Sequence, residues 1–212
     1  MRFEEWEPYY RQILQDFGYD RRKDEEAAQL LEGLLVGPRV LDEELQRLFE
    51  GRAVTVAGNA ESLPEELADL GDFVVAADEA VSILREHGRD PQVLVTDLDG
   101  DVEDQVAANA RGCVAVIHAH GDNMTALQRW VPRFTGPVVG TTQATPFGSV
   151  RNFGGFTDGD RAVCLAAHFG ATSVRLAGFD FENPNAKDTD RATKQRKLDW
   201  AYILIEAVNS GP

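Results

Sequence analysis

Two aspartates in the segment TDLDG (96–100) have the type and spacing of a metal site. Asp97 and Asp99 are two residues apart, so in an extended chain their carboxylates point to the same side. Mg²⁺ prefers a few carboxylates, with substrate phosphates and water as its other ligands. A polar turn is the alternative, because Asp99-Gly100 is also a common turn pair. The segment ends an apolar, strand-like run, and this position favours the metal site.

The segment HAHGDN (118–123) contains two histidines that also alternate. His118 and His120 share one side of the chain, and Asp122 stands at the entry to a predicted helix. Asp122 could simply cap this helix, and the histidines could belong to a transition-metal site. A third imidazole or thiolate is missing from the sequence at a ligand-like spacing. We therefore expect neutral histidines that contact phosphate or a ring.

The most distinctive segment is NFGGFTDGDR (152–161). Its glycines permit tight turns and a close approach of the backbone to a ligand. A helix that begins near Asp158 would present free N–H groups to an anion, and Arg161 adds a positive charge. Because Asp158 and Asp160 do not suit a direct phosphate cradle, we expect one to cap the helix. The other would bind metal or the N–H donors of a heterocyclic ligand. A capped loop without a ligand is the alternative.

Two lysines near the C-terminus form a further candidate site. Lys194 and Lys197 lie one turn apart on the same face of a predicted helix. They are half of the four lysines in a chain that has seventeen arginines. A solvated helix face would explain them, but their rarity favours contact with phosphate.

Short apolar runs alternate with segments of helical length after residue 52. The runs predict strands at 53–58, 72–78, 92–97, 113–120, 137–142 and 173–180. Helices are expected at 61–70, 79–88, 101–111, 122–131, 158–170 and 188–208, and residues 3–49 also have helical periodicity. Strands that are apolar throughout predict a parallel sheet with helices on both faces. The expected fold is therefore α/β and Rossmann-like, with a helical N-terminal extension (1–51) and an α/β catalytic domain (52–212).

The polar segments fall at the ends of these strands. GNAES (58–62) follows the first strand, TDLDG the third, HAHGDN the fourth and GFD (178–180) the sixth. Ligands of open parallel sheets bind beyond the carboxyl ends of the strands. We therefore expect one site at one edge of the sheet, arranged around a divalent cation.

The formal net charge of −15 limits the expected partners. An acidic surface repels phosphate backbones and anionic lipids, so we expect neither nucleic acid nor membrane. Many carboxylates with few lysines resemble the composition of halophilic archaeal proteins, with an ordinary acidic protein as the alternative. Cys113 and Cys164 lie in apolar runs and are expected to be free buried thiols. The first residues have no secretory pattern, so a cytoplasmic location is expected.

Together these segments resemble the archaeal 6-hydroxymethyl-7,8-dihydropterin pyrophosphokinases of the MptE type. The resemblance covers nearly the whole chain and rests on WEPYY (6–10), GNAESL (58–63), TDLDG, HAHGDN, GTTQ (140–143), NFGGFTDGDRA (152–162), LAGFDF (176–181) and a KxxKLDWA helix (194–201). One departure is GNAESL, where many relatives have GNGPSL.

The resemblance implies a core similar to that of thiamin pyrophosphokinases. It implies transfer of diphosphate from ATP to the hydroxymethyl group of the reduced pterin, with release of AMP, in folate or tetrahydromethanopterin biosynthesis. The implied Mg²⁺ ligands are Asp97, Asp99 and Asp122. The implied nucleotide contacts are Gly58, Asn59, Ser62, His118, His120, Thr141, Thr142 and Gln143. The implied pterin contacts are Asn152, Phe156, Asp158 and Asp160. The implied catalytic residues are Asp97, Asp99, Arg161, Lys194 and Lys197.

Such a transfer depends on alignment and charge neutralisation, so no serine or cysteine nucleophile is required. A carboxylate or His118 could accept the hydroxyl proton. A glycosyltransferase-like enzyme that uses a nucleotide sugar and a non-enzymatic nucleotide-binding module are alternatives. NFGGFTDGDR and the short chain favour the pterin enzyme over the first, and carboxylates clustered near phosphates argue against the second. The apolar N-terminal helices could form a contact in a homo-oligomer.

Overall fold

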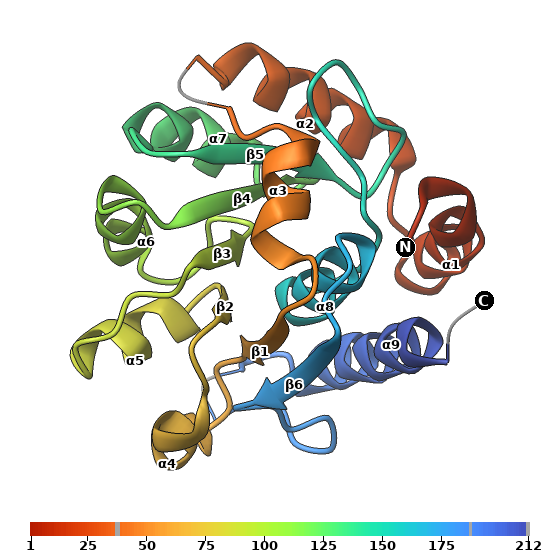
Figure 1. Cartoon of the computed structure of the whole chain (residues 1–212). Coiled ribbons are helices and arrows are strands. Elements are labelled where there is room, and N and C mark those ends of the chain that lie inside the picture. The colour runs from red at the N-terminus through yellow and green to blue at the C-terminus, as the bar shows by residue number, and fades with distance from the viewer. Residues whose placement is uncertain (37–38, 187, 211–212) are drawn as a thin grey trace.

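The computed structural model describes residues 1–36, 39–186 and 188–210. Its strands form one parallel sheet in the order β5-β4-β3-β2-β1-β6 (Figure 1). They are β1 (Ala53–Ala57), β2 (Val74–Ala77), β3 (Val93–Thr96), β4 (Val114–Ala119), β5 (Val138–Thr142) and β6 (Ser173–Ala177). Each strand lies within a run that the sequence assigns to a strand. The predicted α/β fold with a parallel sheet is confirmed.

The helices occupy the segments around these strands. Before β1 come α1 (Phe3–Phe17), α2 (Arg21–Leu34) and α3 (Asp42–Phe49). After it come α4 (Leu63–Glu66), α5 (Ala80–Glu86), α6 (Val102–Ala110), α7 (Met124–Trp130), α8 (Asp158–His168) and α9 (Arg191–Asn209), with short 3₁₀ turns at Leu67–Asp69 and Val131–Arg133. Helix α1 ends at Gly18, whose φ of 69° is a left-handed conformation that glycine adopts readily. None of the described helices is long and apolar enough to cross a membrane.

Two apolar layers cover the two faces of the sheet, because side chains alternate along each strand. In β2, Val74 and Ala76 belong to a layer that also contains residues of α2, α5, α6 and α7. Val75 belongs to the opposite layer, which contains residues of α3 and α8. Of the helices described before β1, α2 and α3 therefore pack directly on the sheet. Helix α1 instead shares an apolar cluster with Leu204 of α9.

The strand order reverses beside β1. From β1 to β5 the chain steps across the sheet in one direction, and β6 then returns to pair with the other edge of β1. The loops after β1 and β6 are in contact, since Gly58 N donates to Ala177 O at 2.8 Å and Ala60 N donates to Gly178 O at 2.9 Å. Ligands of open α/β sheets bind at the carboxyl ends of the strands beside such a reversal.

This contact between loops requires glycine at position 178. Gly178 has a φ of 65°, and a Cβ there would lie 2.7 Å from both Gly58 O and Leu63 Cβ. We expect Gly178→Ala to lower the free energy of unfolding by about 2–3 kcal/mol, because backbone strain and overcrowding add. Gly71→Ala is the matched control, since Gly71 has a φ of 69° and open space around its Cβ position. Urea denaturation measures both losses, and equal losses would contradict the role of the close contact.

Candidate active site

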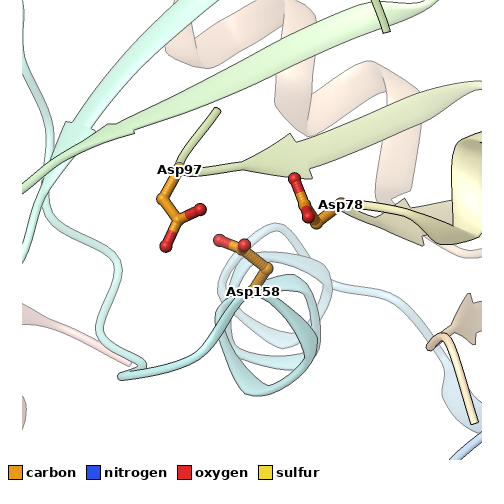
Figure 2. A group of neighbouring side chains, drawn as sticks. All are labelled: Asp78, Asp97 and Asp158. Atoms are coloured by element: carbon orange, nitrogen blue, oxygen red, sulfur yellow. The ribbon is translucent and has the colours of Figure 1, made fainter. Parts of the chain in front are cut away.

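Three carboxylates from separate segments meet at the carboxyl edge of the sheet. Asp78 follows β2, Asp97 follows β3, and Asp158 is the first residue of α8. One oxygen of each lies within 4.8 Å of the others, and Figure 2 shows the three side chains converging. Within the described part of the chain, this is the one group of three acidic, histidine or cysteine side chains with such spacing. We call it the carboxylate triad.

Asp78 is held by a left-handed turn and two neighbouring side chains. Its φ is 43°, a conformation that aspartate tolerates better than most residues. Its Oδ1 accepts hydrogen bonds from Thr96 Oγ1 at 2.9 Å and from Gln105 Nε2 at 2.8 Å. Burial, together with the negative charges of Asp158 and Asp97, raises the pKa of Asp78 well above its usual value.

Asp97 lies beside cations and remains ionised at neutral pH. Its Oδ2 is 3.4 Å from His120 Nε2, and its backbone carbonyl accepts a hydrogen bond from Asn123 Nδ2 at 2.8 Å. Burial alone would raise the pKa of Asp97. The hydrogen bond with His120 and the charges of Arg161 and Lys197 outweigh burial and lower this pKa to about 2.

Asp158 is positioned by the cap of α8. Thr157 is the N-cap residue, and its N–H donates to Asp160 Oδ1 at 2.8 Å. One turn further, Arg161 forms an ion pair with Asp158, with 2.9 Å between Nη1 and Oδ1. Burial, followed by the negative charge of Asp97, raises the pKa of Asp158 to about 8. The arginine only partly offsets these two effects.

The electrostatics of the triad fit a divalent cation. The pKa values of Asp78 and Asp158 are raised and that of Asp97 is lowered. The triad therefore holds protons at neutral pH when no cation is bound. A cation between the three oxygens would displace these protons and remove the repulsion among the carboxylates. Hard oxygen donors suit Mg²⁺, which leaves coordination positions for phosphate and water.

A cavity of about 210 Å³, the first cavity, opens onto the triad. Its walls are the loops after β1 and β6, the start of α8 and a face of α9 that carries Lys194 and Lys197. Both lysines and the helix N-terminus supply positive potential for an anion such as phosphate. The first cavity adjoins a larger one of about 1110 Å³, with which it shares Ala60, Phe179, Asp180, Asn183 and Asn185.

A second cavity, of about 160 Å³, adjoins the first at Asp97, Phe156 and Lys197, which line both. Its remaining walls are the α1–α2 turn (18–24), residues 120–122 before α7, Gln143 and Arg161. Aromatic rings support one wall. The Phe17 and Tyr19 rings stack with their centroids 5.3 Å apart, and the Phe17 and Phe156 centroids are 5.2 Å apart.

The buried carboxylate of Asp24 joins the segments around the second cavity. Its Oδ2 accepts hydrogen bonds from Tyr10 Oη at 2.6 Å and from Gln143 Nε2 at 2.8 Å. Its Oδ1 accepts a hydrogen bond from Gly121 N at 2.8 Å. These bonds link α1, α2 and the loops after β4 and β5, so the shape of the second cavity depends on them.

The sequence matches a family with a described activity. The family model, 6-hydroxymethylpterin diphosphokinase MptE-like, matches residues 36–186. The chain belongs to this family. It is 44% identical to the 6-hydroxymethyl-7,8-dihydropterin pyrophosphokinase of Methanothermobacter thermautotrophicus, and the match covers 97% of this chain and 94% of that protein. The proteins of the same name from Pyrococcus furiosus and Methanocaldococcus jannaschii are 42% and 35% identical, over 97% of this chain and 94% and 95% of theirs. The resemblance inferred from the motifs is confirmed.

In this MptE-like protein, the predicted metal ligands do not form one group. Asp97 belongs to the triad, but Asp99 and Asp122 do not. Asp99 is exposed on the first cavity, and its Oδ1 accepts a hydrogen bond from Gly100 N at 2.9 Å. Asp122 is exposed on the second cavity. The alternation assumed for Asp97 and Asp99 is lost because Leu98, between them, has a φ of 67° and turns the chain.

The predicted nucleotide contacts are divided between the cavities. Gly58 and Asn59 line the first cavity, and His120 and Gln143 line the second. Ser62 lines only the larger neighbouring cavity, where its Oγ donates to Glu66 at 2.9 Å.

The other three predicted nucleotide contacts are buried outside both cavities. His118, Thr141 and Thr142 line a separate space of only about 10 Å³. His118 Nδ1 is 3.1 Å from Thr141 Oγ1. Burial, followed by the charges of Arg161 and His120, lowers the pKa of His118 well below its usual value, so its ring is neutral.

The predicted pterin contacts also separate. Phe156 lines both cavities, and Asp158 belongs to the triad. Asp160 is fully buried and takes part in the cap of α8, and the sequence predicted that either Asp158 or Asp160 would cap this helix. Asn152 is buried and its Nδ2 donates to Ala144 O at 2.8 Å, which fixes the loop before α8.

The predicted cations all reach a cavity. Lys194 lines the first, Arg161 the second, and Lys197 both.

Sequence reasoning missed Asp78. A signal was present, because Asp78 ends the second predicted strand just as Asp97 ends the third. Since β2 and β3 are neighbours in a parallel sheet, the residues that follow them emerge side by side.

Proposed function

We propose that this protein transfers the terminal diphosphate of ATP to the hydroxymethyl group of 6-hydroxymethyl-7,8-dihydropterin and releases AMP. Its membership of the MptE-like family supports the reaction. The observation that carries the proposal is the carboxylate triad, which stands beside two lysines at the carboxyl edge of the sheet. A site for a cation next to fixed positive charges is what phosphoryl transfer from a nucleotide requires.

In this proposal, Asp78, Asp97 and Asp158 would hold Mg²⁺. The ion would neutralise charge on the diphosphate during the transfer. Asp99 and Asp122 are exposed beside the triad, one on each cavity, where they can contact water or substrate.

The pterin hydroxyl oxygen attacks the β-phosphorus of ATP, the bond from that phosphorus to the oxygen bridging to the α-phosphorus breaks, and AMP keeps that oxygen. Lys194 and Lys197 hold the transferred diphosphate, and the junction of the two cavities aligns the hydroxyl with it. Of the two kinds of proton acceptor expected from sequence, His118 lines neither cavity, whereas carboxylates such as Asp97 line both, so a carboxylate is the acceptor in this proposal.

The two alternative functions are not favoured. A nucleotide-sugar transferase and a non-enzymatic binding module would both leave the near full-length similarity to three pyrophosphokinases without explanation.

The test is a product analysis with ATP, Mg²⁺ and 6-hydroxymethyl-7,8-dihydropterin. We expect AMP and the pterin diphosphate in equal amounts, both dependent on Mg²⁺ and on the pterin. Because the chain is strongly acidic, the assay is run in low and in high KCl. Formation of ADP, or no AMP at either salt concentration, would overturn the proposal.

A further inference from the structure

We infer that the second cavity is the pterin site and that Tyr19 and Asp122 recognise the pterin ring. This inference rests on the proposed function. It assigns the substrates to different cavities and gives Asp122 a role in substrate recognition in place of the metal-binding role expected from sequence.

The shapes of the cavities separate the two substrates. ATP is long, with a base, a sugar and three phosphates in series. The first cavity continues into the space of about 1110 Å³ beside it, so an extended ligand can have its phosphates at the triad and its nucleoside further along. The second cavity is about 160 Å³ and is lined by the α1–α2 turn. It suits a compact bicyclic ring.

The junction of the cavities suits the reaction. Asp97, Phe156 and Lys197 line both cavities. A pterin in the second cavity with its hydroxymethyl group at this junction would meet the diphosphate beside the triad. The opposite end of the bicycle, with its 2-amino group and ring N–H, would then face the walls that belong to the second cavity alone.

Those walls contain three carboxylates, and elimination selects one of them. Asp24 already accepts hydrogen bonds at both oxygens. Asp20 caps α2 by accepting a hydrogen bond from Arg22 N at 3.0 Å. Asp122 is exposed, and the described residues form no hydrogen bond or ion pair with its carboxylate. Adjacent N–H donors on one edge of a flat ring pair well with such a free carboxylate.

Tyr19 supplies the flat surface beside that carboxylate. Tyr19 and Asp122 line the same cavity, and the charge of Asp122, after burial, contributes to a raised pKa of Tyr19. The Tyr19 ring is half-buried and held by its stacking on Phe17. A rigid aromatic face beside an acceptor for N–H groups fits a pterin ring.

Measurements of ligand binding test the inference without requiring turnover. The dissociation constants of 6-hydroxymethyl-7,8-dihydropterin and of a non-hydrolysable ATP analogue are measured separately by calorimetry, with Mg²⁺ present. We expect Asp122→Asn and Tyr19→Ala each to weaken pterin binding at least about tenfold and to change binding of the ATP analogue less than about twofold. Asp72→Asn is the matched control, because Asp72 is exposed and lines neither cavity, and it is expected to change neither constant.

A ligand analogue separates recognition from a general structural effect. The 2-oxo analogue, 6-hydroxymethyl-7,8-dihydrolumazine, lacks the 2-amino group, whose N–H groups would donate hydrogen bonds to Asp122. The unaltered protein is expected to bind it at least about tenfold more weakly than the pterin. In Asp122→Asn this preference should fall to within about threefold, because the amide also offers a donor.

The outcomes distinguish the two proposals. If the unaltered protein forms AMP but the variants weaken the ATP analogue and leave pterin binding intact, the cavity assignment is wrong and the proposed function stands. If the unaltered protein neither binds pterin nor forms AMP, both fail. If Asp122→Asn keeps the full preference for the 2-amino group, Asp122 does not recognise the ring.

Discussion

Replacing Asp78 with asparagine is expected to lower kcat for AMP formation about a thousandfold, or ~4 kcal/mol of transition-state stabilisation. The triad would lose one of its three charged oxygens for the cation. The fold should persist, because asparagine tolerates the φ of 43° and can still accept the hydrogen bonds from Thr96 and Gln105. Turnover and Mg²⁺ binding by calorimetry measure the effect.

The same variant should be more stable than the original when Mg²⁺ is absent. The pKa of Asp78 is raised in the folded state, so the carboxyl group costs the fold stability as pH rises above about 4, where the unfolded chain ionises. Asparagine avoids this cost, and we expect the free energy of unfolding in EDTA to rise at pH 7, with a smaller gain at pH 5. Asp72→Asn, at an exposed position outside both cavities, should leave kcat and stability unchanged. Normal turnover by Asp78→Asn would rule out its role as a metal ligand.

Replacing Lys197 with methionine is expected to lower kcat about a hundredfold and to change the KM for ATP less than about threefold. Lys197 lines both cavities, so its charge lies where the diphosphate passes between the substrates. Charge placed at the transferring group stabilises the transition state more than the bound substrate. Methionine keeps most of the side-chain volume, which leaves the loss of charge as the main change.

Lys194→Met is the matched comparison one helical turn away. Lys194 lines only the first cavity, and its Nζ is 3.9 Å from Asp188 Oδ1. We expect the main effect of this variant to be a higher KM for ATP, as for a residue that binds ground state and transition state alike. Equal losses of kcat in the two variants would contradict a special position for Lys197.

The fold could be predicted because its signals are local. Each strand is a short apolar run, and the helical periodicity of residues 3–49 indicates the helices before β1. The direction of the sheet follows from helices placed between the strands. What local signals did not predict is that α2 and α3 pack on opposite faces of the sheet, because that depends on contacts with distant segments.

The site could be predicted only to the level of segments. TDLDG and the start of α8 do meet, but a single left-handed residue, Leu98, separates Asp99 from the triad. Asp158 and Asp160 look equivalent in sequence, yet one helical cap buries Asp160 and leaves Asp158 facing the other carboxylates. To predict Asp78, one needs the rule that residues which follow neighbouring parallel strands emerge side by side. Such backbone angles and burial follow from packing and are absent from the residue types alone.

The network around Asp24 has a consequence for how the protein is made. Asp24 is 97 residues from Gly121 and 119 residues from Gln143, so these bonds join the beginning of the chain to segments translated much later. Contacts of such long range form late in folding. On the ribosome, α1 and α2 emerge before β5. A nascent chain that stops before Gln143 therefore cannot close the second cavity, however much of the sheet it has already formed.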